Sequence, residues 1–401
     1  MLRAYKYRIY PTNSQRVLLA KTFGCVRYLW NQCVATFNSY DKETNPKPEY
    51  KTSTQLRNEI GWMKEVSSTA IQQKEIDFKK YCNQKFSKDR KGKPIGHPKF
   101  KKRGNKQSYR LSNNNIKLKN GKIRLEKIGY IKVVIDRSIP EDAKYMNVTV
   151  SKNPAGQYFV SVCVECEIKQ LNKTNENIGI DVGLKVFLQK SDGDPVANPR
   201  FYRESQTKLA HLQRILSRKV KDSNRWNKLR LRIARLHNQI ANQRSYFLHT
   251  ESTKLVQQYD IICVEDLNVA GLSATCKPKM DETGKYLPNG QSHKKGLNKS
   301  IMDAGWSLFM AMLEYKCNWY GKELVKIDRF APSSKTCSDC GWVDEDQTLK
   351  DRVFACPICG LVIDRDLNAA INIQALGVDS AERTQRERVA DPNEASKIIC
   401  K

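Results

Sequence analysis

The sequence predicts an α+β protein with more than one domain. Its length of 401 residues is greater than that of an ordinary domain with a single hydrophobic core. The hydrophobic spacing is helical in two stretches of residues 11–86, alternates over 116–166, and then marks short buried strands between long helices. Two C-x2-C pairs near the C-terminal end predict a small metal-binding ribbon.

The net charge indicates the kind of partner. The chain has 71 Lys and Arg against 42 Asp and Glu, a formal charge of +29. Such an excess indicates a polyanion, and nucleic acid is favoured over a membrane because no apolar run of 18 or more residues exists. No signal peptide opens the chain, and nine of the thirteen cysteines lie outside the ribbon without regular spacing. We therefore expect a cytoplasmic, nucleoid-associated protein and no membrane partner.

The first elements are a strand and two helices. Residues 2–10 alternate basic and apolar side chains, which predicts a strand with a basic outer face. Pro11 ends this strand, and Thr12 with Gln15 forms a capping-box pattern that begins a helix. A second helix is predicted from about Ser67 to Phe86.

A small antiparallel β unit follows a basic segment. Residues 87–106 are mostly basic and broken by Gly and Pro, so they form either a solvated linker or a loop that grips phosphates, and the total charge favours the loop. Asn120-Gly121 is a type I′ hairpin signal between two alternating segments. Further strands are predicted up to residue 166. The strand at 2–10 could belong to the same sheet.

Two buried strands in the second half each carry an acid. Residues 177–184 contain Asp181 with a glycine two residues away on either side, which leaves room for a ligand to approach the backbone. Residues 259–266 form the second strand, near whose end Glu265 lies. An apolar strand tolerates a carboxylate poorly unless that carboxylate is paired or binds a cation.

The segments around these strands complete the prediction. Residues 205–257 read as two long helices whose outer faces are basic enough to contact nucleic acid. Residues 267–299 are polar, and a loop of this length without its own structure suggests a mobile lid or a contact loop. A helix over 303–320 and a strand over 324–327 lead to the ribbon, and a short helix is expected at 368–376.

The ribbon has the spacing C-x2-C-x15-C-x2-C. Its four thiolates suit a tetrahedral Zn²⁺ and leave no position open for a catalytic water, so the zinc is expected to be structural. Gly341 and Gly360 each follow the second cysteine of a pair, where the turn needs a positive φ. The expected zinc ligands are Cys337, Cys340, Cys356 and Cys359.

Three acids from distant parts of the chain could form one site. Asp181, Glu265 and Asp366 carry hard carboxylate oxygens that suit Mg²⁺ or Mn²⁺, and such a set can hold two cations. A basic protein with this set would hydrolyse phosphodiester bonds. Asp364 is the rival for the third position. We favour Asp366 because it adjoins a helix start, whereas Asp266 should face away from Glu265 in a strand.

Five segments together resemble the TnpB family of transposon-encoded, RNA-guided DNA nucleases, which is related to the compact type V CRISPR effectors. They are GIDVGLK (179–185), VEDLN (264–268), SSKTCSDCG (333–341), CPICG (356–360) and DRDLNAAINI (364–373). The opening YKYRIYPTNSQ also resembles the start of the family. The resemblance runs from residue 1 to about 376.

The resemblance implies a fold of several domains. A wedge β-barrel would be interrupted by a helical recognition insert, and an RNase H-like RuvC α/β domain would carry an inserted zinc ribbon with four cysteine ligands. The expected bounds are 1–10 and 107–170 for the wedge, 11–106 for the insert, 176–330 and 364–378 for RuvC, 331–363 for the ribbon, and 379–401 for a disordered tail.

The resemblance also implies an activity. A guide RNA from the transposon end would pair with double-stranded target DNA next to a short flanking motif that the protein reads. Asp181, Glu265 and Asp366 fall on the catalytic acids of the family, and the four ribbon cysteines fall on its zinc ligands. The regions that read the flanking motif contain Tyr50, Ser68, Thr69, Gln72, Ser112 and Asn113.

Two other functions stay open. Family members without the acids serve as RNA-guided DNA-binding regulators that do not cut, and the intact acids here count against that function. A transposase of the same RNase H-like class typically orders its acids Asp, Asp, Glu, whereas this chain has Asp, Glu, Asp.

Overall fold

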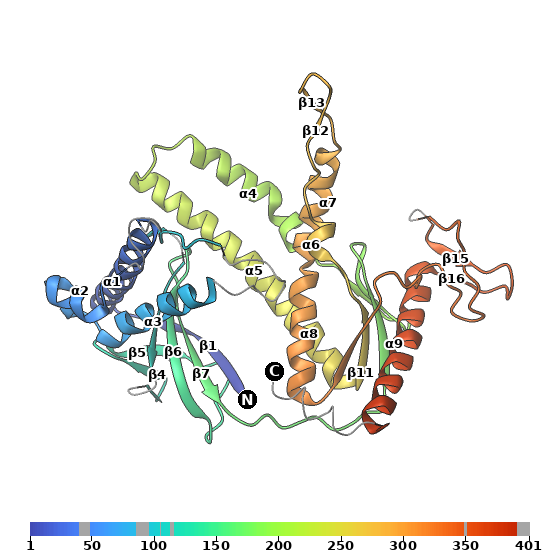
Figure 1. Ribbon diagram of the computed structural model, residues 1–401, viewed down its shortest axis with the longest axis horizontal. Coiled ribbons are helices and arrows are strands. Elements are labelled where there is room, and N and C mark those ends of the chain that lie inside the picture. The colour runs from blue at the N-terminus through green and yellow to red at the C-terminus, as the bar shows by residue number, and fades with distance from the viewer. Residues whose placement is uncertain (40–48, 86–95, 105, 113–115, 349–350, 391–401) are drawn as a thin grey trace. The chain divides into compact units, whose positions relative to one another are not determined.

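The computed structural model describes residues 1–39, 49–85, 96–104, 106–112, 116–348 and 351–390. They form two units, whose elements are labelled in Figure 1. Residues 1–167 and 224–235 make the first unit, and residues 168–223 with the chain from 236 onward make the second.

The first unit is built on a seven-stranded sheet in which every neighbouring pair of strands is antiparallel. The strand order is β2-β6-β7-β1-β5-β4-β3, so β1 lies between strands that come much later in the sequence. The strands are β1 (Leu2–Tyr10), β2 (Gln107–Ser112), β3 (Lys117–Lys119), β4 (Lys122–Leu125), β5 (Gly129–Val134), β6 (Lys144–Lys152) and β7 (Tyr158–Glu165).

Two local predictions for this unit are confirmed. Thr12 and Gln15 make the capping box, in which each side chain bonds the backbone of the other. Asn120 and Gly121 both adopt positive φ, at 50° and 64°, as a type I′ turn between β3 and β4 requires.

The helices of the first unit lie between β1 and β2 in the sequence. They are α1 (Asn13–Asn38), α2 (Ser53–Glu59), the 3-10 turn η1 (Gly61–Glu65) and α3 (Ser68–Lys85). Leu29, Met63 and Phe78 are among the buried side chains that hold them together in a core of their own. Arg110 of β2 pairs with Asp77 of α3 at 2.8 Å, which ties these helices to the sheet.

The second unit is built on a five-stranded mixed sheet of order β10-β9-β8-β11-β14. β8, β11 and β14 are parallel to one another, while β9 and β10 add an antiparallel edge. The strands are β8 (Asn177–Val182), β9 (Val186–Lys190), β10 (Pro195–Ala197), β11 (Ile261–Glu265) and β14 (Glu323–Ile327).

Helices cover both faces of this sheet (Figure 1). Ile178, Ile180, Ile262 and Val264 pack into the core that α5 (Asn224–Gln258) and α8 (Trp306–Tyr320) share. Successive residues of a strand point to opposite faces, so the residues between them point to α9 (Arg365–Ala390). The preceding helix α4 (Phe201–Ser217) and α5 match the two long helices predicted over 205–257.

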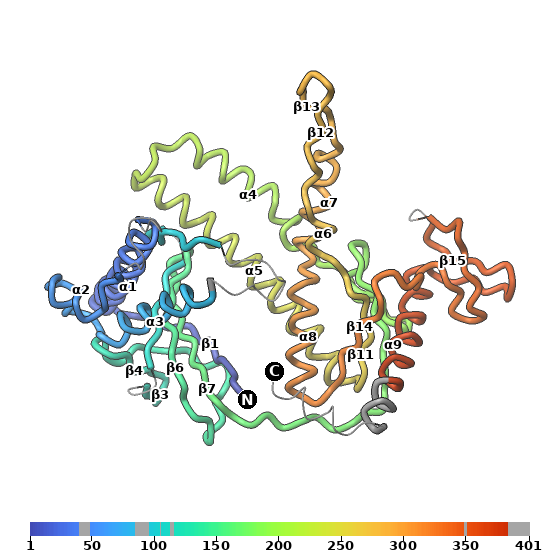
Figure 2. The backbone as a smooth tube through the Cα atoms, in the orientation of Figure 1, coloured from blue at the N-terminus to red at the C-terminus, as the bar shows by residue number. Residues whose placement is uncertain are grey.

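Two predicted irregular segments are ordered instead. Residues 267–299 form α6 (Val269–Leu272), the hairpin of β12 (Lys279–Met280) and β13 (Tyr286–Leu287), and the start of α7 (Gln291–Ala304), as Figure 2 shows. Asp281 closes the hairpin by accepting hydrogen bonds from Thr283 and Lys285. Residues 379–390 continue α9, whereas a disordered tail was expected from 379. The rest of that tail, 391–401, lies outside the described residues.

No helix in the described ranges is long and apolar enough to cross a membrane.

Candidate active site and metal centre

Asp181 and Glu265 lie at the carboxyl ends of adjacent parallel strands. Val264 of β11 pairs with Ile180 of β8, so the next residues, Glu265 and Asp181, are at the same level of the sheet. Both belong to the face that points to α9. Ligand sites of open α/β sheets form at this edge, outside the carboxyl ends of the strands.

The helix α9 lies directly on this face because two glycines allow it. A Cβ on Gly179 would lie 2.1 Å from the Ala370 carbonyl oxygen, and a Cβ on Gly377 would lie 2.3 Å from the Cys263 sulfur. Helix backbone therefore fills the space beside Gly179, and the expectation that this glycine leaves room for a ligand is wrong.

This packing directs Asp366 toward the other two acids. Asp366, Ala370 and Gly377 share one face of α9, because residues four and eleven apart lie nearly above one another in a helix. Ala370 and Gly377 contact β8 and β11, so Asp366 in the first turn faces the ends of these strands.

Burial and the two neighbouring acids all raise the pKa of Asp181. Burial raises the pKa of the Asp181 carboxyl to about 7, and the negative charges of Glu265 and Asp366 also raise it, against the lowering influence of Arg365. The charges of its two neighbours thus disfavour the ionised form of Asp181. A divalent cation would relieve this repulsion, so the set of donors fits Mg²⁺ or Mn²⁺.

Asp364 and Asp366 have different roles. The Asp364 carboxylate accepts hydrogen bonds from the backbone N–H groups of Asp366 at 2.9 Å and Leu367 at 3.2 Å, so it caps α9. The Asp366 carboxylate accepts from Arg365 at 3.0 Å. Asp266 pairs with Arg329, outside the three-acid group.

The first residues of the ribbon connect Glu265 to α9. Ser333 donates its hydroxyl to Glu265 Oε1 at 2.6 Å, and its carbonyl accepts from the Asn372 amide at 2.8 Å. Asn372 and Asn368 also donate to the Thr336 carbonyl, at 2.6 and 2.7 Å. The ribbon therefore holds the start of α9 in place beside Glu265.

The prediction of site residues from sequence missed Ser333, Arg365, Asn368 and Asn372. Arg365 and Ser333 carry no distinguishing signal in the sequence. The two asparagines do, because polar residues four apart in an otherwise apolar helix indicate a buried polar contact. Both are buried.

The four ribbon cysteines form a second cluster. Their ligand atoms all lie within 4.8 Å of one another, and the Sγ pairs Cys337–Cys359 and Cys340–Cys356 are both 3.5 Å apart. A zinc tetrahedron with bonds of about 2.3 Å has edges of about 3.8 Å. The cluster could therefore bind zinc. Within the described ranges, these cysteines are the one group of three or more His, Cys, Asp or Glu whose ligand atoms are gathered tightly enough for a single ion, and the carboxylates of Asp181, Glu265 and Asp366 are spaced more widely.

Glycine turns shape both halves of the ribbon. Gly341 and Gly360 adopt φ of 79° and 77°, as their positions predict. Each donates its N–H to the first cysteine of its pair, at 3.1 Å to Cys337 and 3.0 Å to Cys356. The short strands β15 (Val353–Ala355) and β16 (Val362–Asp364) then lead the chain into α9.

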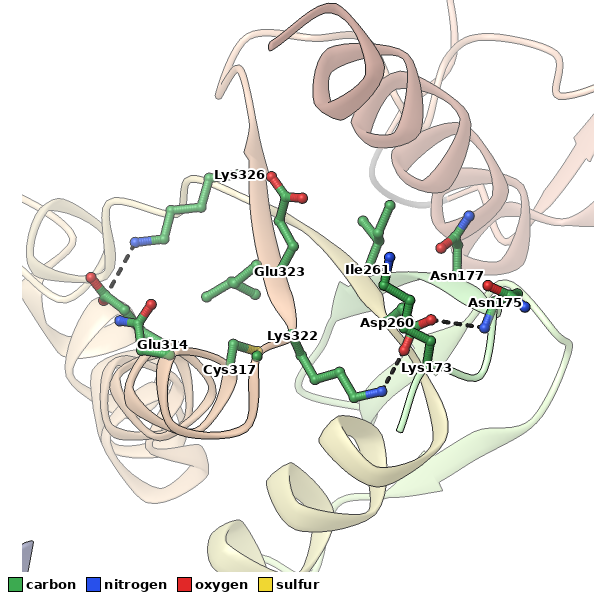
Figure 3. A pocket seen from close by; sticks show the side chains of 13 residues that line it. Lys173, Asn175, Asn177, Asp260, Ile261, Glu314, Cys317, Lys322, Glu323 and Lys326 are labelled. Carbon is green, nitrogen blue, oxygen red and sulfur yellow. Dashed lines mark hydrogen bonds and ion pairs between the residues drawn. The ribbon is translucent and has the colours of Figure 1, made fainter. Parts of the chain in front are cut away.

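A pocket of about 860 Å³ lies at the opposite edge of the same sheet (Figure 3). Asn177, Ile261 and Glu323 line it, and each begins a parallel strand, so the pocket is remote from the acids. Asp260 there accepts hydrogen bonds from Lys322 and from the N–H of Asn175 at 2.8 Å. These contacts fasten the linker before β8, and we assign the pocket a structural role.

The residues expected to read a flanking motif lie in the first unit. The Tyr50 ring packs edge-on against Phe78, 5.3 Å between centroids, so most of it is used in the helical core. Ser68, Thr69 and Gln72 lie in the first turns of α3, where Gln72 is exposed. Ser112 ends β2, and Asn113 lies outside the described residues.

Curated relatives match this chain over nearly its whole length. A Streptomyces pristinaespiralis protein named "Putative RNA-guided DNA endonuclease" is 36% identical, over 96% of this chain and 93% of its own. The Escherichia coli relative InsQ, of the same description, is 31% identical over 94% and 92%. The chain belongs to the TnpB family.

Family models match three parts of this TnpB-family chain. Residues 161–275 match the model described as "Probable transposase", and residues 306–373 match a Cas12f1-like TNB domain. Residues 1–45 match a model described as a helix-turn-helix domain, although the described part of this stretch is one strand and one helix. A solved Cas12f1–sgRNA–target DNA complex is also similar, at 12% identity and a TM-score of 0.48, over 93% of this chain and 98% of that one.

Proposed function

We propose that this protein is an RNA-guided DNA endonuclease that hydrolyses phosphodiester bonds at a site made of Asp181, Glu265 and Asp366. The supporting observation is the convergence of these acids at the carboxyl edge of the β8–β11 pair. The family membership supports RNA guidance, because the relatives are named for it.

The three carboxylates would hold two Mg²⁺ or Mn²⁺ ions. When bound, such ions supply an activated water and stabilise the leaving oxygen. The protein orients the carboxylates through its own contacts: Ser333 fixes Glu265, Arg365 holds Asp366, and the cap at Asp364 begins α9. A structural zinc in the ribbon would keep Ser333 and Thr336 against α9.

The domain assignment forms part of the proposal. The seven-stranded sheet corresponds to the wedge, the helices α1 to α3 to the recognition insert, and the five-stranded sheet with α9 to RuvC. A guide RNA from the transposon end and double-stranded target DNA would be the partners. The exposed Gln72, with Ser68, Thr69 and Ser112, is proposed to read the flanking motif, and Tyr50 to support α3 from the helical core.

The test is cleavage of a plasmid library with a randomised flank by the protein purified with its co-expressed RNA. We expect Mg²⁺-dependent depletion of one flanking motif and none with EDTA. Asp181→Ala should abolish cleavage while RNA and DNA binding stay near normal. Continued cutting by this variant would sink the assignment of the acids.

The matched description "Probable transposase" keeps strand transfer as the second candidate. The same assay separates it, because a transposase joins the ends that it cuts, and sequencing of the products would reveal joined strands. Binding of a target with RNA present, but without depletion, would instead indicate a regulator that does not cut.

A further inference from the structure

A basic pocket lies next to the three acids within the second unit. Its volume is about 560 Å³, and Lys185, Arg200, Arg203 and Arg352 all line it. Lys185 follows Asp181 by four residues, and Arg352 Nη1 lies 4.0 Å from the Asp366 carboxylate. Arg352 thus connects the wall of the pocket to Asp366.

The positive charge of this pocket is not neutralised by its one acidic wall residue, Asp303. The Asp303 carboxylate is buried and accepts hydrogen bonds from the N–H groups of Tyr202 and Arg203, each at 3.0 to 3.3 Å. It also pairs with Arg244 at 2.6 Å. Its charge is thus already used by the first turn of α4 and by α5.

The cations of the pocket have few partners of their own. Neither Lys185 nor Arg200 makes an ion pair with any described residue, although Arg200 donates to the Leu184 carbonyl at 3.4 Å. Among the described residues, the one ion pair of the Arg352 side chain is the 4.0 Å contact with Asp366. Arg203 is held in place by Gly296 O at 2.7 Å and Ser300 Oγ at 2.9 Å. Four like charges around one cavity repel one another unless an anion binds there.

We infer that this pocket binds a backbone phosphate of the DNA strand that is cut, adjacent to the phosphodiester at the acids. A strand crossing the acids must carry its next phosphates past their edge, and the neighbouring cations suit them because Arg and Lys bind phosphate oxygens. The inference rests on the proposed function and adds Arg200, Lys185, Arg203 and Arg352 as residues that position the substrate.

The test combines a protein variant with a change to a single phosphate. The variant is Arg200→Gln with Lys185→Gln, which removes two cations with few partners. The matched control, Lys254→Gln with Lys326→Gln, removes two exposed cations of the same unit, which pair with Glu251 and Glu314. Each protein, with its guide RNA, cleaves target DNA that carries one neutral methylphosphonate at successive positions around the cut.

We expect one methylphosphonate position beside the cut to slow wild-type cleavage about tenfold, the effect of losing one charge-assisted hydrogen bond. The variant should cleave unmodified DNA about as slowly as the wild type cleaves the modified DNA, and the methylphosphonate at that position should not slow the variant further. The control should behave as the wild type, and guided DNA binding should be equal in all three. Only a direct contact makes the two changes non-additive.

Two outcomes overturn the inference while leaving the proposed function intact. In one, the wild type cleaves, but at every position the methylphosphonate slows the variant by the same factor as it slows the wild type, so the two changes act independently. In the other, only neutral linkages placed in the guide RNA lose their effect in the variant, which assigns the pocket to the guide. Absence of any Mg²⁺-dependent cleavage by the wild type would instead refute the proposed function itself.

Discussion

At the scale of single residues, the candidate site opposes the stability of its own fold. Asp181 faces Glu265 and Asp366, and burial raises the pKa of its carboxyl to about 7. Like charges held together in a partly buried place destabilise the folded chain, and active sites commonly carry such a cost.

Asp181→Asn should therefore stabilise the metal-free protein while it removes cleavage. The amide has the same shape without the charge, and we expect the free energy of unfolding to rise on the order of 1 kcal/mol. Asp364→Ala, two positions from the third acid, should lower it by about 1 kcal/mol because α9 loses its cap. Thermal unfolding in EDTA compares the two, and a loss of stability in Asp181→Asn would contradict the repulsion.

The ionised carboxylate of Asp260, in contrast to that of Asp181, stabilises the folded protein. Burial opposes its ionisation, but the hydrogen bond from Lys322 and the N–H groups of Asn175 and Thr174 outweigh burial and bring the pKa to about 2. Because the folded pKa lies below the unfolded value of about 3.9, this stabilisation is complete above about pH 4 and is lost as the pH falls toward 2.

Asp260→Asn should thus unfold at lower urea concentration than the wild type at pH 7, and the difference should shrink as the pH falls below 4. Glu323→Gln removes a neighbouring carboxylate of the same pocket that makes no ion pair in the described chain, and it should change little at either pH. A difference that stays constant down to pH 2.5 would exclude the ion pair as its source.

The sequence indicated Asp181 and Glu265 because a carboxylate inside an apolar strand is unusual. It favoured Asp366 over Asp364 because Asp366 adjoins the expected helix start, but the first residue of that helix was not predictable. The structure begins α9 at Arg365, so Asp364 is the cap. Ser333 could not be predicted, because its partners Glu265 and Asn372 are distant in sequence and are brought to it by the fold.

At the scale of elements, the position of α9 depends on small residues in the sheet. Gly179→Ala places a methyl group 2.1 Å from the Ala370 carbonyl, and backbone cannot move aside as a flexible side chain can. We expect a loss of about 1–3 kcal/mol in unfolding free energy. Cleavage should fall as well, because Asp366 moves with the helix.

Gly24→Ala is the matched control for this substitution. Gly24 lies within α1, and a Cβ there would meet nothing within 4 Å. This variant should be as stable as the wild type or slightly more stable, because alanine favours helix over glycine. Equal cleavage by wild type and Gly179→Ala would show that α9 does not set the geometry of the acids.

The ribbon is predicted to support the same helix. Cys356→Ser should lose the zinc, unfold residues of the ribbon and release the contacts of Ser333 and Thr336 with α9, so cleavage falls although every acid is present. Cys276→Ser, outside the ribbon, should keep both zinc and activity. Metal analysis measures the loss of zinc, and limited proteolysis detects the unfolding of the ribbon. Full activity in zinc-free protein would show that the ribbon does not position the acids.

Element prediction failed where composition imitated a loop. Residues 267–299 are polar and rich in Gly, Lys and Asn, yet they form a hairpin and part of a helix. The Asp281 side chain closes the hairpin by accepting local hydrogen bonds from Thr283 and Lys285. The hairpin therefore forms without the alternating apolar residues by which strands are usually predicted. Periodicity does not detect such a turn.

At the scale of the whole molecule, strand and helix types were predictable and sheet membership was only partly so. β1 alternates clearly, but its neighbours β5 and β7 are separated from it by the helices α1 to α3. The sequence allowed β1 to join the later strands, but its partners and register are set by the packed structure, of which a single sequence contains little trace. The sheet of the second unit was easier, because its parallel strands are short apolar runs between helices.

The charge of the whole chain leads to the last prediction. With a formal charge of +29, repulsion among the positive side chains destabilises the folded protein, and binding of a polyanion should stabilise it. Binding of its RNA should weaken steeply with salt, because each neutralised phosphate of a single strand contributes about −0.7 to the slope of log K against log salt. Anisotropy between about 0.1 and 0.4 M salt measures this slope, and thermal unfolding with and without RNA measures the stabilisation. If the affinity for RNA does not change across this range, contacts with phosphates do not provide the binding energy. Shape complementarity and base stacking would then have to provide it.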